Sequence, residues 1–438
     1  MEGKTQKTGQ SELTRRVIFL LLMLAVYRIG VHIPTPGVDA EAIDQLFKGF
    51  AGTLLGLFDM FSGRALSRFS IFAMGIMPYI SSSIIIELLT VVWPHLSRLK
   101  KEGGQDGRRK LTQYSRYLTV GLSLFQGFML AVGLERMTMG SQSVVIEPGL
   151  TFRLMAMVTL AAGTCFIMWL GEQITERGIG NGISLIIFAG IVEGLPAAVT
   201  GVFSDLGSSE QSLLRMAVMV AILVLVVAGV VFCERAQRRI PVQYAQRVVG
   251  RKMMTGRSTH LPLKLNPAGV IPPIFASSLI MFPATLGQFV DLPFLKELTT
   301  RNNWLYNIVY VALIVFFCYF YTGVQFNPED VAENMKKNGG FIPGIRPGPK
   351  TAEYMDKVLT RLTLWGAAYV SIICLMPSFI MDYFKVNFYF GGTALLIVVG
   401  VSLDTMAQIQ THLTNRQYEG ILKKGMAGMG RIQPRRRA

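Results

Sequence analysis

Three charged side chains inside apolar stretches are the first candidates for chemistry in this sequence. They are Glu87, Glu193 in IFAGIVEGLP, and Arg28 near the outer end of the first apolar stretch. A charge inside a membrane is costly and usually marks ion or proton handling. None of the three has an obvious partner at helical spacing, so the pattern gives little support to ion coupling. Both glutamates could instead reach an interface or a basic group of an adjacent subunit.

Catalytic and metal-binding patterns are not evident. His32, His95, His260 and His412 fall at loops or span ends, and no H-E-x-x-H, G-x-S-x-G or Walker pattern occurs. The stretch ERGIGNG joins two apolar stretches and is interpreted as a tight turn. The cysteines are far apart and lie in or at the ends of apolar stretches, which favours core packing over a disulfide or metal site. We therefore expect no enzyme activity, no cofactor and no metal.

Composition indicates a polytopic membrane protein. Of its 438 residues, 51% are hydrophobic and 16% are charged, and a membrane-spanning helix needs about 20 mostly apolar residues. The first fourteen residues are polar and are not followed by a cleavage pattern, so no removable signal peptide is expected. Ten stretches of helical length occur, at about 15–34, 70–93, 114–134, 152–171, 182–203, 212–233, 267–290, 304–323, 361–381 and 392–409.

Basic residues predict the orientation. Ten spans place both termini on one side, and most of the 43 lysines and arginines then fall on that side, which is the cytoplasmic side by the positive-inside rule. The cytoplasmic parts are a tail at 1–14, loops at 234–266 and 324–360, and a tail at 410–438. Both loops are longer than topology requires. Their charge predicts docking to an acidic partner, either ribosomal RNA or an acidic protein surface.

A weak internal repeat predicts two inverted halves, at 15–205 and 206–409. AMGIMPYISSSII from Ala73 matches AGVIPPIFASSLI from Ala268, and each stretch belongs to the second span of its half. Interrupted helices at corresponding positions are typical of a cavity between inverted repeats. The alternative is coincidence between apolar sequences.

Isoleucines one helical turn apart offer a different kind of site. Ile76 with Ile80, and Ile183 with Ile187, each share a helix face. Ordinary helix packing is the simpler explanation. A ring of such side chains could instead form a hydrophobic constriction that closes by dewetting.

Several long motifs, in order, resemble the SecY/Sec61-alpha family, the channel subunits of the Sec protein translocase. They are MFSGRALSRFSIFAMGIMPYISSSIII, WLGEQITERGIGNGISLIIFAGI, STHLPLKLNPAGVIPPIFASS, GFIPGIRPG and FYFGGTALLIVVGVSLDTMAQIQ. The resemblance extends from the N-terminal tail to about Lys424. It implies an all-α polytopic membrane protein with ten transmembrane helices in two inverted five-helix halves around a central pore. Unfolded polypeptides would cross through the pore, and signal sequences would leave sideways into lipid.

The resemblance also implies roles for individual residues. The pore ring would comprise Ile76, Ile80, Ile183, Ile187, Ile274 and Ile397. The lateral gate, between spans 2/3 and 7/8, would include Ser82, Ser83, Ser277 and Ser278. Docking of the ribosome and of the SecA ATPase would use Arg251, Lys252 and Arg346. The implied partners are the SecE and SecG subunits, the SecA ATPase, the ribosome, signal peptides, nascent chains and membrane lipid, and the implied location is the bacterial inner membrane.

The segment at 52–66 is too short to span a membrane and carries charge. We expect it to fold back into the outer funnel of the channel as a plug, with Phe58 and Phe61 toward the isoleucine ring. The plug residues would be Leu57, Phe58, Phe61, Ser62, Gly63 and Arg64. The alternative is a re-entrant loop that merely packs there. Glu87, Arg64, Glu193 and Pro267 depart from the family pattern and put details of gating in doubt. The rival from another class is an inverted-repeat secondary transporter of a small solute, which would need paired charges inside the membrane.

Overall fold

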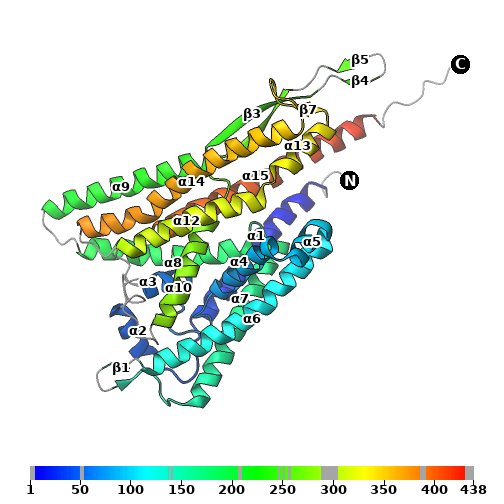
Figure 1. Cartoon of the computed structure of the whole chain (residues 1–438). Helices are drawn as coiled ribbons and strands as arrows, with labels where there is room; N and C mark the ends of the chain where they lie inside the picture. Colours follow the sequence, from blue (N-terminus) through cyan, green and yellow to red (C-terminus); the bar gives the residue numbers. More distant parts are fainter. Residues whose placement is uncertain are drawn as a thin grey trace.

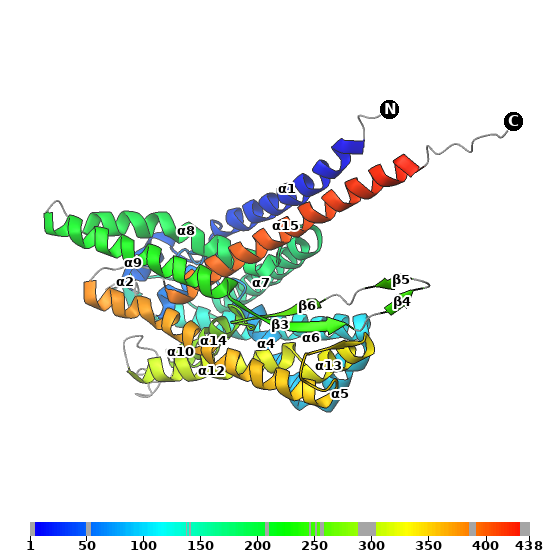
Figure 2. The same ribbon diagram turned by 90° about the horizontal axis from the view of Figure 1, so that it is seen from above.

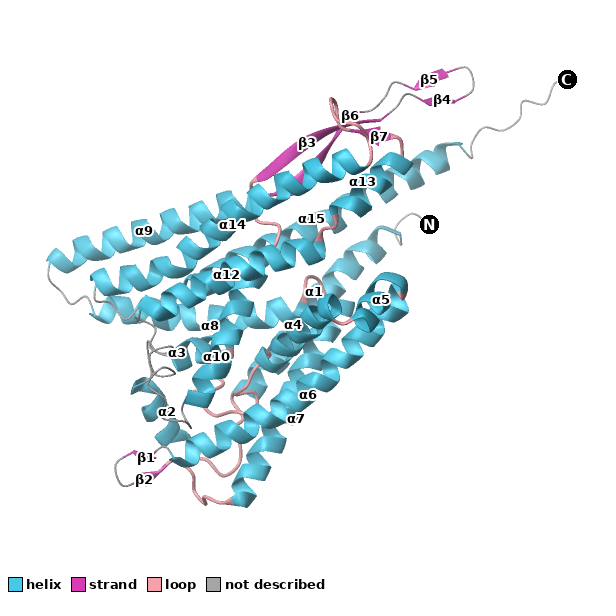
Figure 3. Cartoon of the chain, viewed as in Figure 1, coloured by secondary structure: helices cyan, strands magenta, loops and turns pink. Residues whose placement is uncertain are grey.

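The computed structural model is a helical bundle with a small β-sheet at one end and a short β-hairpin at the other (Figures 1 and 3). It describes residues 5–49, 54–136, 138–139, 142–205, 210–244, 247–249, 252–254, 258–287, 304–384 and 391–429. Each of the ten apolar stretches expected from the sequence overlaps a helix.

The first half of the chain contributes eight helices and a short hairpin. In chain order they are α1 (Thr5–Val31), α2 (Ala40–Gly49), α3 (Leu54–Phe61), α4 (Met77–Val92), α5 (Pro94–Glu102), α6 (Gly104–Arg136), β1 (Thr138–Met139), β2 (Gln142–Ser143), α7 (Leu150–Arg177) and α8 (Gly182–Asp205). α4 packs on α6, and α6 packs on α7.

The second half contributes the remaining helices and strands. They are α9 (Glu210–Arg235), β3 (Gln237–Tyr244), β4 (Arg247–Val249), β5 (Lys252–Met254), β6 (Ser258–Lys264), α10 (Ile271–Gly287), α12 (Trp304–Gln325), α13 (Pro328–Lys337), β7 (Gly340–Phe341), α14 (Pro349–Phe384) and α15 (Gly392–Met429). α10 contacts α4, and α15 contacts α8, so both pairs join the first half of the chain to the second.

Five helical stretches within the described residues are long and apolar enough to cross a membrane. They are Gly104–Arg136, Leu150–Arg177, Trp304–Lys337, Pro349–Pro377 and Gly392–Thr414. A sixth appears if α4 and α5 are one span bent by 97°. The start of α1 and the end of α15 lie at the same end of the bundle, together with β3, β6 and α13 (Figures 1 and 2). This placement agrees with an even number of crossings.

The prolines of the repeated motif begin helices and do not interrupt them. Pro78 lies in the first turn of α4, and Pro272 and Pro273 lie in the first turn of α10. A proline is tolerated there because its missing N–H would have no partner within the helix anyway. Residues 70–76, expected to be part of the second span, form turns. The second span is therefore shorter than its apolar stretch.

The two long loops are joined by a three-stranded antiparallel sheet in the order β6-β3-β7. β3 and β6 come from the loop after α9, whereas β7 comes from the loop after α12, and Tyr244 of β3 pairs with Gly340 of β7. A separate apolar cluster fastens the sheet to α13 and α14 through Ile240, Val242, Leu263, Met335, Ile342, Met355 and Leu359. The loops therefore form one protrusion, a pairing that the sequence did not reveal.

Candidate functional site

All six isoleucines expected to form the pore ring belong to one hydrophobic cluster. Ile76, at the N-cap of α4, and Ile80 are 2% and 7% exposed, and Ile187 and Ile397 are also buried. Ile183 and Ile274 are partly buried and pack against the same cluster. The six side chains come from α4, α8, α10 and α15, and therefore from both halves of the chain. Their role as a ring stays a prediction; the structure places four of them in this extensive cluster and the other two against it.

The expected plug segment forms the short helix α3 followed by turns. Met60 and Phe61 are buried in the same cluster as the isoleucines, as expected for Phe61. Leu57 and Phe58 belong to α3, but their side chains lie outside the described residues. The helix ends at Phe61, and Gly63 and Arg64 follow with φ values of 67° and 60°, which is a conformation that only glycine adopts freely.

The turn after α3 is held by side chains of α1. The Tyr27 hydroxyl donates to the Ser62 carbonyl oxygen at 2.9 Å, and Arg28 Nη1 donates to the Gly63 carbonyl oxygen at 3.3 Å. Arg28 also forms an ion pair with Glu193 of α8. The two charges are 165 residues apart, so helical spacing could not reveal the pair. Glu193 therefore pairs with a basic group of its own chain, and not with an interface or an adjacent subunit, the alternatives considered from the sequence.

Asp59 organises the rest of this segment. Its carboxylate accepts from the Ser67 backbone N–H at 2.7 Å, and its carbonyl oxygen accepts from the Arg64 backbone N–H at 2.7 Å. Residues beyond the turn are tied to the chain after α1, because the Thr35 N–H donates to the Phe69 carbonyl oxygen at 2.9 Å. The described part of the segment is therefore folded, and it is held to α1 at the turn and to the chain after α1 at Phe69.

Glu87, the other isolated charge, also has a partner. Its carboxylate lies 3.7 Å from Lys100 Nζ on α5. Both side chains are about one-third exposed, and surface pairs of this kind contribute about 0–1 kcal/mol. Glu87 thus lies near the bend between α4 and α5, in contact with a basic group of the same chain.

The four serines assigned to the lateral gate have different surroundings. The Ser278 hydroxyl of α10 donates to the Ile274 carbonyl oxygen of its own helix at 2.8 Å, and it also lies 3.8 Å from the thioether sulfur of Met77 on α4. The contact with Met77 crosses between the halves. Ser277 donates only to Ile274 of its own helix among the contacts described, and Ser83 is partly buried. A gate at this boundary stays a prediction.

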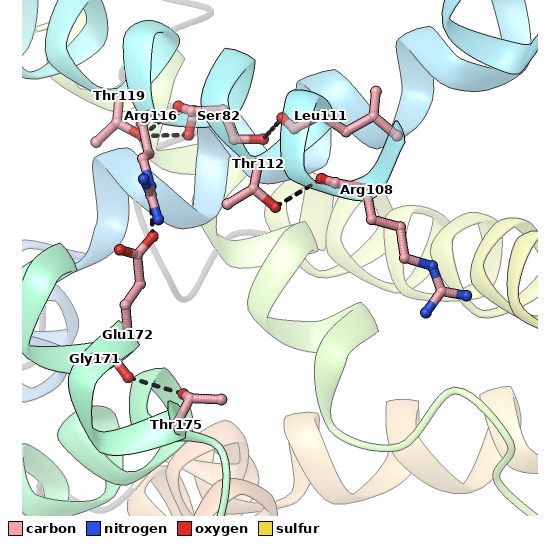
Figure 4. Close-up of polar contacts among 10 residues, drawn as sticks. Ser82, Arg108, Leu111, Thr112, Arg116, Thr119, Gly171, Glu172 and Thr175 are labelled. Atoms are coloured by element: carbon pink, nitrogen blue, oxygen red, sulfur yellow. Dashed lines mark hydrogen bonds and ion pairs between the residues drawn. The ribbon is translucent and has the colours of Figure 1, made fainter. Parts of the chain in front are cut away.

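Ser82 faces away from that boundary. Its hydroxyl lies 2.6 Å from the Thr119 hydroxyl of α6, and both side chains are buried (Figure 4). One turn of α6 away, Arg116 Nε donates to the Glu172 carboxylate of α7 at 2.8 Å (Figure 4). α4, α6 and α7 are therefore linked by polar contacts as one block, and any opening between α4 and α10 would move that block together.

We expect Ser82→Ala to reduce the free energy of unfolding by about 1 kcal/mol, because the Thr119 hydroxyl loses its buried side-chain partner. Chemical denaturation in detergent would measure this. Ser83→Ala, on the same helix with no described side-chain partner, is the control. In a double-mutant cycle with Thr119→Ala, an additive result would contradict the Ser82–Thr119 interaction.

Strand β5, which contains Lys252, and the loop between β7 and α14, which contains Arg346, lie at the end of the bundle that carries the sheet (Figure 1). Arg346 is exposed in the loop between β7 and α14, and its carbonyl oxygen accepts from Thr351 Oγ1 at 3.0 Å. Lys252 belongs to strand β5, but its side chain is not described, and Arg251 lies outside the described residues. Nearby on α14, hydrogen bonds from Lys357 and Lys350 lower the pKa of the Glu353 carboxyl.

A family model named SecY matches residues 70–406. The chain is 52% identical over 439 residues to the protein translocase subunit SecY of Escherichia coli (strain K12), covering 98% of this chain and 99% of that protein. The chain belongs to the SecY family. It is therefore a multi-pass membrane protein of the protein translocase, and the sequence-based identification is confirmed.

Solved SecY-family channels have the same fold. One is a SecY protein whose plug domain stabilises the closed state of the translocation channel and maintains a membrane seal. It superposes with a TM-score of 0.61 at 18% sequence identity, and the match covers 91% of this chain and 92% of that chain. Another is Sec61 in the canine ribosome–channel complex, with a TM-score of 0.59 at 16% identity and the same coverage. The mostly helical SecY/Sec61 channel fold is thus confirmed for this chain.

Proposed function

We propose that this chain forms a protein-conducting channel in which the six isoleucines seal the pore and residues 52–66 plug it from outside. The observation that carries the proposal is the shared hydrophobic cluster. Phe61 lies in it with Ile76, Ile80, Ile187 and Ile397. A pore that passes many sequences cannot rely on specific hydrogen bonds, whereas aliphatic side chains can seal around varied side chains without binding them tightly. The chain itself would carry out no reaction.

The lateral gate would open where α4 meets α10. The Ser278–Met77 contact is weak, since sulfur is a poor acceptor, and the linked block of α4, α6 and α7 could move as one. Signal sequences and transmembrane segments would leave through this opening into lipid.

The protrusion would dock the ribosome and the SecA ATPase through Arg251, Lys252 and Arg346. Its basic sequence and exposed Arg346 support this. A Sec61 relative occurs in a ribosome–channel complex, which agrees with a ribosomal partner. SecE and SecG would accompany the chain in the bacterial inner membrane, with both termini in the cytoplasm.

A stalled translocation substrate tests the proposed path. With a single cysteine placed by Ile397→Cys, we expect disulfide crosslinks to a cysteine in a polypeptide arrested midway. Ile372→Cys is the matched control, because Ile372 is 64% exposed on the outside of α14 and would face lipid.

Crosslinking at both positions or at neither would contradict the proposed path. The alternative, a secondary transporter of a small solute, predicts no crosslink to a polypeptide at position 397. The Arg28–Glu193 pair does not favour that alternative, because the same guanidinium binds the backbone of the plug segment.

A further inference from the structure

The Arg28–Glu193 ion pair has a feature that ordinary structural pairs lack. Both side chains belong to the walls of the bundle, α1 and α8, but Arg28 also binds the turn between them through the Gly63 carbonyl oxygen. The Arg28 side chain is 34% exposed and that of Glu193 is 19% exposed. Neither side chain is fully buried.

The backbone of the turn lies directly against α8. A Cβ atom added at Gly190 would lie 3.0 Å from the Gly63 nitrogen and 3.1 Å from its Cα. A Cβ atom added at Gly63 would lie 3.8 Å from Glu193 Oε2. Gly63 thus sits within a pocket whose sides are Tyr27, Arg28, Gly190 and Glu193, and the turn can be seated only when α1 and α8 are close together.

Other charges lie near the pair. Arg64 and Arg68, both from the segment after α3, act electrostatically on Arg28 with the same sign of charge. Without Glu193, there would be one negative charge fewer to offset the repulsion between the Arg28 guanidinium and these two cations. The repulsion would oppose seating of the turn.

We infer that the Arg28–Glu193 pair is a latch that holds the Ser62–Gly63 turn against α1 and α8 while the channel is closed. This rests on the proposed plug. Glu193 acts as a positioning residue: it neutralises Arg28 and orients the guanidinium so that Nη1 points at the Gly63 oxygen. Opening the channel then requires the turn to leave Arg28, and separation of α1 from α8 would break the ion pair that orients the guanidinium.

Neutralising the carboxylate tests the latch. In reconstituted channels, Glu193→Gln is expected to raise resting ion conductance. It should also raise the rate at which an impermeant maleimide modifies the thiol introduced by Met60→Cys. We expect an increase of about tenfold, because loss of a charged hydrogen-bonding partner shifts the closed–open equilibrium by about that factor. The four native cysteines are replaced by alanine in all variants. Arg28→Lys keeps a charged donor and should lie between wild type and Glu193→Gln.

Glu135→Gln is the matched control. Glu135 pairs with Arg153 at 2.6 Å between α6 and α7 and is well buried, but the contacts described for this pair do not involve the turn. It should leave conductance and maleimide modification unchanged even if it lowers stability.

The outcomes separate the latch from the plug. If replacing residues 56–65 raises conductance but Glu193→Gln changes neither readout, the latch is wrong and the plug stands. If Glu193→Gln lowers stability but alters the readouts no more than Glu135→Gln does, the pair is merely structural and the latch is again wrong. If neither plug replacement nor Glu193→Gln raises conductance, the proposed plug itself fails.

Discussion

Replacing both Ile80 and Ile187 by glycine is expected to raise resting ion conductance by about tenfold or more. The two residues are 7% and 3% exposed and face the same cluster from different helices. Removing both side chains would leave space for water, and a hydrophobic constriction excludes ions only while it stays narrow and dry. A barrier lowered by about 1.4 kcal/mol already gives a tenfold faster passage. Planar-bilayer recordings of the purified channel would measure the change.

The control replaces Ile308 and Ile372 by glycine. Both lie in membrane helices and are 57% and 64% exposed on the outside of the bundle, so they reproduce the cost of two glycines in helices, about 1 kcal/mol each relative to alanine. Their conductance should equal that of wild type. Equal conductance in both double variants would exclude the isoleucines as the seal, whereas a solute carrier would lose uptake instead.

Replacing residues 56–65 by a flexible glycine–serine run of equal length is expected to increase resting permeability and the acceptance of defective signal sequences. The exchange removes Phe61 from the isoleucine cluster and abolishes the seat of the turn against Gly190. Ion conductance measures the resting permeability. Export of a reporter protein with an impaired signal sequence measures the acceptance of defective signal sequences.

The replacement keeps the segment between α2 and α4 at its original length. Any change in permeability then reflects loss of the plug and not strain from a shortened connection. A variant that replaces only residues 104–106, the first residues of α6, supplies the comparison for a glycine–serine replacement outside the plug segment. Wild-type permeability in the plug replacement would mean that the segment only packs against the channel.

Much of the fold could be predicted because its signals are local. Each of the ten apolar runs of helical length overlaps a helix within the described residues, and the i, i+4 isoleucines were identified as sharing a helix face. The start of the second span was misjudged, since hydropathy does not distinguish a helix from the apolar turns before Pro78. The family resemblance, and not spacing, connected Ile274 and Ile397 to the other isoleucines.

Contacts between distant parts of the chain could not be predicted from the sequence. Arg28 and Glu193 were noticed as isolated charges of opposite sign, both in apolar stretches, and that sign difference was the available signal for a pair. The hydrogen bonds of Tyr27 and Arg28 to backbone oxygens could not be predicted from the residue types. The strand pairing of Tyr244 with Gly340 likewise depends on how two loops meet in space.

That pairing gives the protrusion a mechanical property. β3 follows α9, β6 precedes α10, and β7 lies between α12 and α14 in the chain. The sheet therefore connects the ends of four membrane helices to one another. A strand in an antiparallel ladder is loaded through many hydrogen bonds at once. A force applied by a partner at β3 is therefore shared among these helices, and the second half responds to it as a stiff body and not as a yielding loop.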